Sequence, residues 1–560
     1  MVAPCGCARN STTVAGKLGR RDFLRHGGRV AAGAVLLPGV AAGVLEACAS
    51  LGDASLSSGP QPPRHGGSLT FACEAEINSF DPRIGAWDQT AYCYARTVYD
   101  PLFTQAADGT IKPYLAQSIT PNADYTQWSI RLRPGIKFHD GSPLDANAVK
   151  INLDGVAHSP LTGPFLLNIQ SIKVIDPLTV LVTMFTPWVP FPAYLTNVNG
   201  YMCGLKQLAD TSGRASPIGT GPFVFKEWVP GDHFTATRNP DYWRRGLPYL
   251  DSFTFKPITD PIPRGNGLLA GDYDLMHSSD SQNVAGFLHR PGYNQVTDLN
   301  AVIGEPDMNF IMLNTLVPPL NDLRVRQALA YATDRQRVID TLYSSLTPPA
   351  EGPFMPGSPY YGRTGFPVHD PVRARALIAD YQKDFGPVSF KFKTVNTEKG
   401  RLRNELLQSM WKDVGVTTEI VQVEQSPLIV DAIVGNYQAM GFRQFNAPDP
   451  DANFVWWISA AGAPVGKQAL NFTRVKDAQL DAGLLAGRTQ VDPQVRAAAY
   501  RLVASRLAAV VPYLWLGPTT WIVVGRQTAG GIGQATLPDG TPARGMMSGI
   551  VFSGELWRTE

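Results

Sequence analysis

The sequence has few of the residues from which metal centres and disulfide frameworks are built. Its 560 residues include only six cysteines and eight histidines. Three cysteines precede residue 50, and the spacings of the others, Cys73, Cys93 and Cys203, match no zinc pattern. An odd number permits at most one disulfide, with buried free thiols as the alternative. No metal site and no cofactor is predicted.

Motifs of the common hydrolases and nucleotide-binding proteins are also missing. The chain contains no G-x-S-x-G and no H-E-x-x-H. Gly219 and Gly221 are not followed by Lys-Ser/Thr, and the glycines at 265–271 make a poor dinucleotide fingerprint. An enzyme is therefore not expected. A secreted hydrolase stays as an alternative because paired carboxylates cannot be recognised without coordinates.

An excess of charge is lacking once the N-terminus is set aside. Residues 1–47 contain six basic and two acidic residues, which leaves 43 basic and 45 acidic residues in the remainder. A chain so close to neutral does not attract the phosphate backbone, so no nucleic-acid partner is expected. Long apolar runs are equally scarce, because only the N-terminal segment approaches the length of a membrane span.

The N-terminal segment has the features of an export signal. Arg20-Arg21 precedes an Ala-, Val- and Leu-rich stretch at 27–45 that Pro38 interrupts, as in twin-arginine signals. The following L-E-A-C ends at Cys48 like a lipobox, in which the cysteine is lipidated; ordinary cleavage nearby, with Cys48 incidental, is the alternative. We therefore interpret 1–47 as a twin-arginine-like lipoprotein signal. The Ser-, Gly- and Pro-rich residues 48–67 are interpreted as a flexible tether.

The remaining chain is too long for one hydrophobic core, because single cores stop growing near 250–300 residues. Its 46 prolines and 53 glycines imply many turns and favour a mixed α/β chain over a helical bundle. The composition is otherwise that of a soluble globular protein, with 44% hydrophobic and 17% charged residues. No internal repeat is present.

The stretch Pro113–Asp154 predicts a structural corner. Residues 128–133 alternate with period two, as a half-buried strand requires. A Pro-Gly turn, a short strand over 136–138 and a His139-Asp140-Gly141 turn follow. Asp145 is placed to cap the next helix. The corner itself predicts turn roles for His139 and Asp140.

The same stretch resembles extracellular solute-binding family 5, the dipeptide-, oligopeptide- and nickel-binding subunits of ABC importers. The resemblance rests on the alternating strand, R-x-G-[IV]-x-F-H-D-G and the capped helix in that order. Further blocks resemble the family in order: GTGPF at 219–223, EWVPGD at 227–232, RNPDYW at 238–243, and VRQALAYA with Asp334-Arg335 from Val325 onward. Together the blocks cover most of residues 66–557.

The resemblance implies an α/β, two-lobed periplasmic-binding-protein-like fold of type II, in the large three-subdomain cluster, with a ligand cleft between the lobes. Lobe I would comprise 68–83, 216–306 and 518–560, with an added subdomain at 84–215. Lobe II would comprise 307–517. Members of the family close like a hinge on their ligand, and their ATPase partners supply the energy of transport.

Candidate ligand-binding residues follow from the implied cleft. Dipeptide-binding members hold the ligand's amino group with an aspartate four residues after the glycine of G-W-x-x-D; here Gly441-Phe442 begins that stretch, and Phe445 stands at the aspartate position. An apolar ring cannot replace that charge, so a free peptide amine as main determinant is in doubt. Arg443 could bind a carboxylate, or alternate with a buried Phe442 as a solvent-facing residue. The remaining candidates are the polar residues Glu74, Asn309, Asn314 and Asn446 and the aromatic Trp456, for which packing is the alternative.

The resemblance therefore implies an exported substrate-binding protein that captures peptides and delivers them to a membrane permease with its ATPase subunits. The open alternative within this class is a non-peptide solute, such as a sugar oligomer, opine, tetrapyrrole or metal chelate. The other expectations are a monomer, a lipid anchor at Cys48 and a location on the extracytoplasmic face of the membrane.

Overall fold

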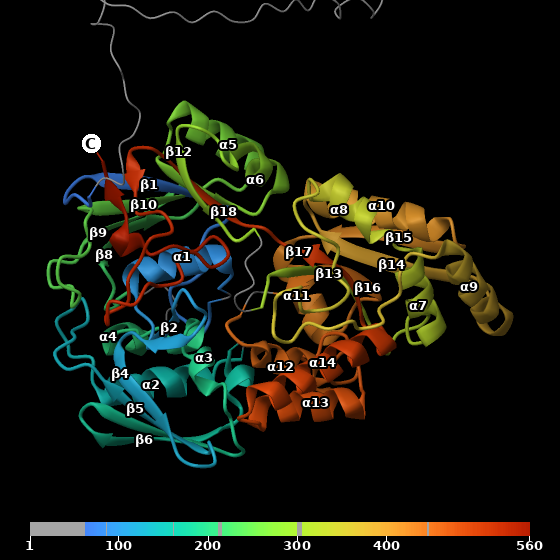
Figure 1. Cartoon of the computed structure of the whole chain (residues 1–560), viewed down its shortest axis with the longest axis horizontal. Helices are drawn as coiled ribbons and strands as arrows, with labels where there is room; N and C mark the ends of the chain where they lie inside the picture. Colours follow the sequence, from blue (N-terminus) through green and yellow to red (C-terminus); the bar gives the residue numbers. More distant parts are fainter. Residues whose placement is uncertain are drawn as a thin grey trace, which may run out of the picture. The chain divides into compact units, whose positions relative to one another are not determined.

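The computed structural model describes residues 62–85, 87–160, 162–210, 216–299, 305–444 and 447–559. Three sheets of four or more strands organise these residues (Figure 1). The helices around them are α1 Gln89–Val98, α2 Ala146–Ala157, α3 Phe191–Tyr194, α4 Leu205–Ala209, α5 Pro261–Ala270, α6 Ser281–Phe287, α7 Leu323–Ala332, α8 Arg335–Leu342, α9 Pro371–Phe385, α10 Glu398–Lys412, α11 Gln425–Val434, α12 Phe454–Trp457, α13 Ala478–Thr489 and α14 Pro493–Val510. Within the described ranges no helix is both long and apolar enough to cross a lipid bilayer.

A seven-stranded sheet forms the centre of lobe I, with strand order β12-β18-β11-β1-β10-β9-β8. Its strands are β1 Ser68–Cys73, β8 Phe223–Val229, β9 His233–Arg238, β10 Ser252–Pro257, β11 Leu275–Ser278, β12 Tyr293–Thr297 and β18 Ile522–Arg526. The central strand β1 pairs in parallel with β10 and β11, and Leu69 and Phe71 bury their side chains. Helix α1 packs into this core through Ala91, Tyr94 and Val98, so the range 84–215 is divided between two cores.

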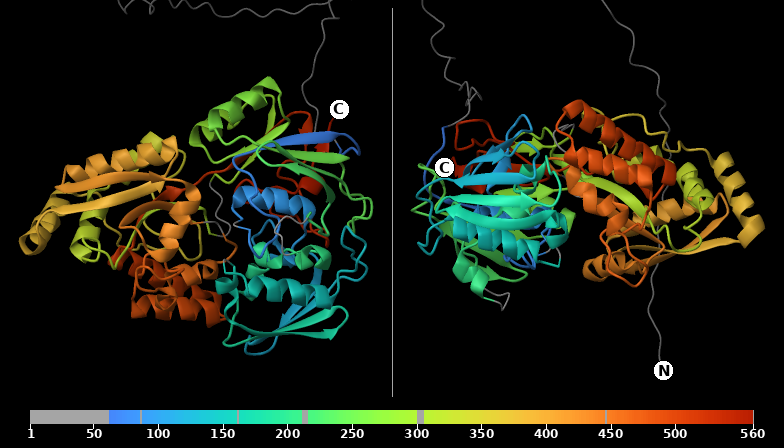
Figure 2. Two further views of the ribbon diagram at one scale, coloured as in Figure 1. Left: turned by 180° about the vertical axis from the view of Figure 1, so that it is seen from behind. Right: turned by 90° about the horizontal axis from the view of Figure 1, so that it is seen from below.

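A four-stranded antiparallel sheet, in the order β4-β5-β7-β6, forms the second body, which we call the four-stranded subdomain (residues 102–202). Its strands are β4 Ala116–Pro121, β5 Gln127–Leu132, β6 Ile169–Asp176 and β7 Thr179–Met184, and the short pair β2 Phe103–Gln105 and β3 Ile111–Pro113 precedes them. Figure 2 shows α2 lying along one face of this sheet. The runs 172–174 and 180–183 on either side of Asp176-Pro177 predict a hairpin, and β6 and β7 form it.

The predicted corner is confirmed in its main parts and corrected in one. Asp145 caps α2 by accepting a hydrogen bond from Ala148 N at 2.8 Å. The short strand expected over 136–138 is wrong, because only an isolated bridge joins Lys137 to Pro143 there. The imidazole of His139 contacts the carbonyl oxygen of Gly221 at 3.0 Å, and burial lowers its pKa. His139 therefore clamps the chain at 219–221 as well as standing in a turn.

The glycines of this 219–221 segment have a packing role. A methyl group at Gly219 or Gly221 would collide with the main chain of Val98, at the end of α1. The segment can approach the helix end so closely only because both residues lack a side chain. These glycines fit backbone to backbone within lobe I.

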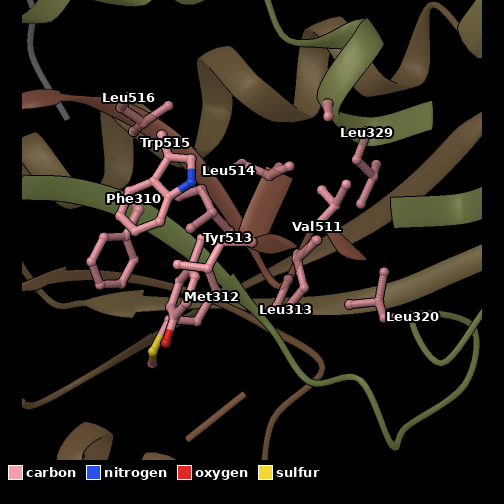
Figure 3. Packing of buried hydrophobic residues seen from close by; sticks show 14 of the residues in the cluster. Phe310, Met312, Leu313, Leu320, Leu329, Val511, Tyr513, Leu514, Trp515 and Leu516 are labelled. Carbon is pink, nitrogen blue, oxygen red and sulfur yellow. The ribbon is translucent and has the colours of Figure 1, made fainter. Parts of the chain in front are cut away.

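A five-stranded sheet, in the order β15-β14-β16-β13-β17, forms lobe II together with α7 to α14. Its strands are β13 Met308–Leu313, β14 Val388–Val395, β15 Val416–Val423, β16 Ala439–Gln444 and β17 Tyr513–Pro518. Strand β13 pairs antiparallel with both β16 and β17. Figure 3 shows the apolar side chains of β13 and β17, among them Phe310, Tyr513 and Trp515, packed in the core of this lobe.

Two expectations for lobe II need correction. The apolar spacing in residues 323–342 predicts a single helix, but this range is divided into α7 and α8, because Asp334 caps a new helix by accepting from Arg337 N. The positions of Arg326 and Arg335 in this helical sequence predict helix salt bridges, but both residues donate to main-chain carbonyls instead, among them Val510 O and Pro367 O. Both arginines therefore fasten loops onto the helices.

Two chain segments connect lobe I with lobe II. One contains Asp307, and the other is the short turn between β17 and β18. The apolar run over 512–524 predicts a single strand, which this turn divides in two. Thr519 N donates to Asp307 O at 2.7 Å, and Trp521 N donates to the carboxylate of Asp298 at 2.7 Å. The two connections are thus hydrogen-bonded to each other where they pass between the sheets.

The three cysteines beyond the N-terminal segment are buried free thiols. Burial raises the pKa of Cys73, Cys93 and Cys203 alike. They therefore stay protonated and act as small apolar side chains in the core of lobe I.

Candidate functional site

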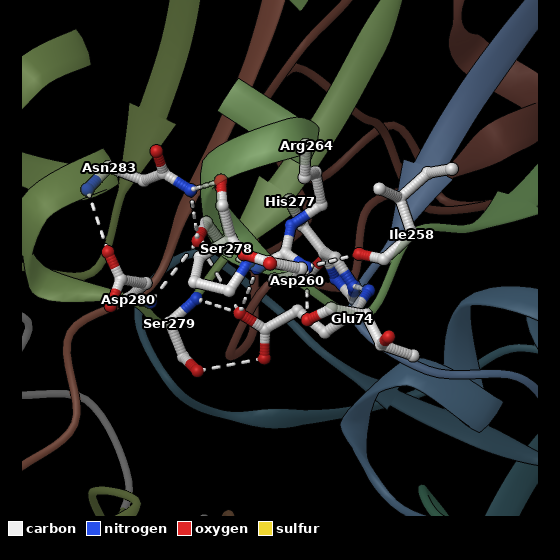
Figure 4. A network of polar contacts seen from close by, with 12 residues as sticks. Glu74, Ile258, Asp260, Arg264, His277, Ser278, Ser279, Asp280 and Asn283 are labelled. Carbon is white, nitrogen blue, oxygen red and sulfur yellow. Dashed lines mark hydrogen bonds and ion pairs between the residues drawn. The ribbon is translucent and has the colours of Figure 1, made fainter. Parts of the chain in front are cut away.

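Glu74 directly follows β1, and its carboxylate is engaged by Arg264 and Ser279 within lobe I (Figure 4). One oxygen lies 3.0 Å from Arg264 Nη2 and accepts from Ser279 N at 2.6 Å, while the other accepts from Ser279 Oγ at 2.8 Å. Burial is the largest single influence and opposes ionisation, but the charge of Arg264, the hydrogen bond from Ser279 N and other neighbouring groups together outweigh it and lower the pKa of Glu74. Glu74 thus orders the loop after β11.

His277 of β11 holds the main chain at Glu74. Its Nε2 accepts a hydrogen bond from Glu74 N at 3.0 Å, and its Nδ1 lies 3.3 Å from the carbonyl of Gly549. Burial lowers the pKa of His277 to about 4, so the ring is neutral at pH 7. One acceptor and one donor nitrogen are what a neutral imidazole provides.

Asn309 of β13 and Asn314, which directly follows this strand, have structural partners. Asn309 donates to Thr519 Oγ1 at 2.7 Å and so ties β13 to the connection between the lobes. Asn314 is fully buried and donates to the carbonyls of Gly435 and Tyr437, each at 3.1 Å. The prediction that Asn314 contacts a solute is corrected, because its side chain has no surface open to one.

Arg443 of β16 lies beside both connections. Its Nη1 lies 3.5 Å from the carboxylate of Asp307, and its guanidinium carbon lies 5.7 Å from the ring centre of Trp521. The side chain keeps 31% of its surface exposed, whereas Asp307 is completely buried. The neighbouring Phe442 is half-buried and packs edge-on against Phe472 in lobe II. Arg443 is therefore placed to present a cation at the boundary between the lobes.

Two further cations of lobe II lie near Arg443, and the sequence reasoning missed both. Lys399 and Arg403 are four residues apart on α10, on the same flank of the helix. A side chain at Gly441, two residues before Arg443, would collide with the guanidinium of Arg403, so that group lies flat on β16. Lys399 Nζ lies 4.9 Å from the ring centre of Tyr343. Their spacing on a helix was the signal that could have found them.

A small hollow lies beside these cations. Its lining combines residues of lobe I, lobe II and the connection: Ser279, Ser281, Tyr343, Leu346, Thr347, Pro518 and Thr520. Ser279 is held by Glu74, and Tyr343 carries Lys399 over its ring. Residues of both lobes and of one connection thus meet at this hollow.

Trp456 has a different position, between lobe II and the four-stranded subdomain. Its ring packs against Phe472 of its own lobe at 4.9 Å between ring centres, and edge-on against Phe165 of the subdomain at 5.5 Å. The neighbouring Asp451 is fully buried and forms a two-point ion pair with Arg488. Asp451 also accepts from Trp188 Nε1 of the subdomain at 2.8 Å. We call this set the Asp451 contact.

Three predicted residues lie outside the described part of the chain. Phe445 and Asn446 follow directly after β16, and Cys48 belongs to the N-terminal segment. Of the predicted site, the structure therefore brings Arg443 and Asn309 to the connections, keeps Glu74 engaged nearby, and separates Trp456 from them.

Comparison with known proteins gives this geometry a context. A profile of the bacterial extracellular solute-binding proteins, family 5, matches residues 110–464. The chain belongs to this family. The family consists of the solute-binding proteins of ABC importers, which bind small solutes or peptides and work with a membrane permease.

Relatives with different ligands resemble the family 5 chain to a similar degree. The glutathione-binding protein GsiB of Pectobacterium atrosepticum is 26% identical over 80% of this chain and 87% of its own length. The nickel-binding periplasmic protein of Escherichia coli is 26% identical over 85% of this chain and 93% of its own. The relatives fix the class of protein and leave the solute open.

The solved structures confirm the fold. AppA of Bacillus subtilis, in complex with a nonapeptide, has a TM-score of 0.76 at 22% identity and covers 89% of this chain and all of its own. AgaA in complex with agropinic acid has a TM-score of 0.77 at 22% identity, and the match covers 88% of this chain and 99% of AgaA. The family 5 chain thus has the predicted two-lobed binding-protein fold.

Proposed function

We propose that this family 5 protein captures short peptides with a free carboxylate between its two lobes and delivers them to an ABC permease. The observation that carries the proposal is the position of Arg443. Its side chain is partly exposed beside both connections, where it lies near Asp307 and Trp521. A guanidinium presents paired N–H donors that match the two oxygens of a carboxylate.

The peptide class is supported by the relatives and by the chemistry at hand. GsiB is named for binding glutathione, and AppA holds a nonapeptide. We do not propose a free amine as the main determinant of peptide binding, because Phe445 stands where dipeptide-binding members have the anchoring aspartate. A carboxylate held by Arg443 is therefore the determinant we propose for the peptide.

A non-peptide acid is the second candidate. The same guanidinium would bind any carboxylate, and AgaA is a neighbour in fold whose structure holds agropinic acid. Metal chelates, opines and sugar acids belong to this candidate.

Export and anchoring complete the proposal. The twin-arginine-like segment would direct the chain out of the cytoplasm, and Cys48 would carry the lipid that holds a monomeric receptor at the extracytoplasmic face. The permease and its ATPase subunits are the protein partners. Labelling with a radioactive fatty acid, in the parent and in Cys48→Ser, tests the anchor.

A thermal-shift screen of the full chain tests the proposed ligand class. Free peptides of graded length, their C-terminal amides and non-peptide acids should be compared, because a ligand that binds the native state raises the melting point by mass action. We expect free peptides to shift the melt and the amides to lose most of the shift. Equal shifts would refute the role of Arg443. If no peptide acts but another acid does, the peptide class is wrong.

Arg443→Gln provides the matched variant, since it removes the charge and keeps most of the length. Arg401→Gln on α10 is the control, because Arg401 pairs with Glu398 and Glu405 on the outer side of that helix. The peptide-dependent shift should fall in Arg443→Gln alone.

A further inference from the structure

Lys399 and Arg403 are cations whose surroundings do not neutralise them. Within the described ranges, neither side chain has a carboxylate within ion-pair distance. Arg403 donates to neutral oxygens only, at 2.9 Å to Thr394 Oγ1 and 3.3 Å to Asn404 Oδ1. Lys399 faces the ring of Tyr343. Like charges four residues apart on a helix repel each other, so this arrangement costs stability.

The nearest acids are engaged elsewhere. Asp280 of lobe I caps α6 by accepting from Gln282 N and Asn283 N, each at 3.0 Å. Glu74 is paired with Arg264 and Ser279. Both acids attract Lys399 only over a longer distance. Burial has the larger influence and lowers the pKa of Lys399.

Lys399 and Arg403 are less accessible to water than ordinary surface cations. Lys399 and Arg403 are each partly buried, and burial also lowers the pKa of Arg403. The outer flank of the same helix shows the contrast, because Arg401 there is neutralised by Glu398 and Glu405. One flank of α10 is thus compensated, and the flank toward lobe I is not.

We infer that Lys399 and Arg403 form a second anion subsite beside Arg443, so that the preferred solute carries two acidic groups. This inference rests on the proposed function, since it places the second group on the same solute. Arg403 lies on β16 at Gly441, two residues from Arg443 and on the same face of the strand. One carboxylate on Arg443 leaves a second acidic group of a short peptide within reach of α10. The class of solute is therefore acidic peptides or other compounds with two anionic groups.

The test compares matched probes on the full chain. Ala-Glu-Ala and Ala-Gln-Ala differ only in the charge of one side chain, and glutarate offers two carboxylates without a peptide. We expect the Glu peptide to bind about ten-fold more tightly than the Gln peptide, as a charge-assisted hydrogen bond implies. This preference should weaken with added salt and disappear in Arg403→Gln and Lys399→Gln. It should persist in Arg401→Gln.

Equal binding of the two peptides, or a preference retained in both variants, would overturn the inference and leave the proposed function standing. If neither peptide binds but glutarate does so in an Arg403-dependent manner, the peptide class is wrong and the subsite stands. If no probe gives a shift that depends on Arg403, the subsite is wrong.

A measurement without ligand provides a second criterion. Because no carboxylate in the described part of the chain lies within ion-pair distance of Lys399 and its one attractive close contact there is the ring of Tyr343, Lys399→Gln should melt close to the parent at low salt. A melting point clearly below the parent would mean that Lys399 stabilises the ligand-free protein, which contradicts a charge kept for a solute.

Discussion

Replacing Asp451 by asparagine should destabilise the protein strongly, because this residue joins lobe II to the four-stranded subdomain. Asp451 is fully buried and its two oxygens face Arg488 at 3.0 and 3.1 Å. Trp188 and Tyr194 of the subdomain donate to it as well, from 2.8 and 3.1 Å. Asparagine keeps the shape and removes the charge that compensates Arg488.

The magnitude follows from the burial of the partner. Only 9% of the Arg488 side chain is exposed, and its guanidinium is enclosed by the rings of Phe454 and Trp188 at 3.4 and 5.0 Å. Breaking a buried ion pair by removing one partner costs roughly 3–5 kcal/mol. The NH₂ group of asparagine would also face groups that donate hydrogen bonds to Asp451, namely Trp188, Tyr194 and Arg488. We therefore expect the free energy of unfolding to fall by an amount at the upper end of this range.

Denaturant unfolding, followed by tryptophan fluorescence, is the appropriate assay, since Trp188 reports on the contact itself. The matched control is Asp477→Asn, whose carboxylate pairs with Arg506, an arginine with 30% of its side chain exposed. We expect the control to lose at most about 1 kcal/mol, because asparagine caps a helix about as well as aspartate and the ion pair with Arg506 is partly exposed. An Asp451→Asn protein within 1 kcal/mol of the parent would refute the reasoning.

Three further predictions address the site and its supports. Gly441→Ala should displace the flexible guanidinium of Arg403, which would weaken binding of acidic probes with little change in melting point; unchanged binding would contradict the placement of Arg403. Asn314→Ala should lower the free energy of unfolding by about 1–3 kcal/mol, because two buried carbonyls lose their donor, while solute binding measured by calorimetry stays the same. In the parent, the free energy of unfolding should fall as the pH drops from about 6.5 to 4, because His277 binds a proton in the unfolded chain but stays neutral in the folded one. This loss, on the order of 3 kcal/mol, should be absent in His277→Gln. Parallel pH profiles of parent and variant in denaturant unfolding would exclude that role for His277.

The local structure was predictable where the sequence signal is local. The alternation at 128–133 became β5 at Gln127–Leu132, and the cap at Asp145 starts α2. The signal failed where tertiary contacts decide: Asp334 interrupts the helix expected over 323–342, and the apolar run after Pro512 is shared by two sheets. Apolar periodicity records burial and does not say in which sheet a strand is buried.

The candidate site was predictable only in part, for a similar reason. Arg443 was found through the resemblance to the family. The spacing of Lys399 and Arg403 marks them only as two cations on one flank of a helix, and the structure is needed to show that, among the residues it describes, Arg403 donates to neutral oxygens alone. Asn314 was chosen for its chemistry, and its burial decided against it. Whether a polar side chain serves a ligand or a carbonyl of its own chain depends on contacts that no spacing in the sequence shows.

A crystal structure of the full chain with the tightest-binding peptide of the screen would test the central claim most directly. The account predicts that the peptide lies between the two lobes, with a carboxylate on the guanidinium of Arg443. A peptide bound elsewhere, or one bound between the lobes with its carboxylates turned away from Arg443, would contradict it.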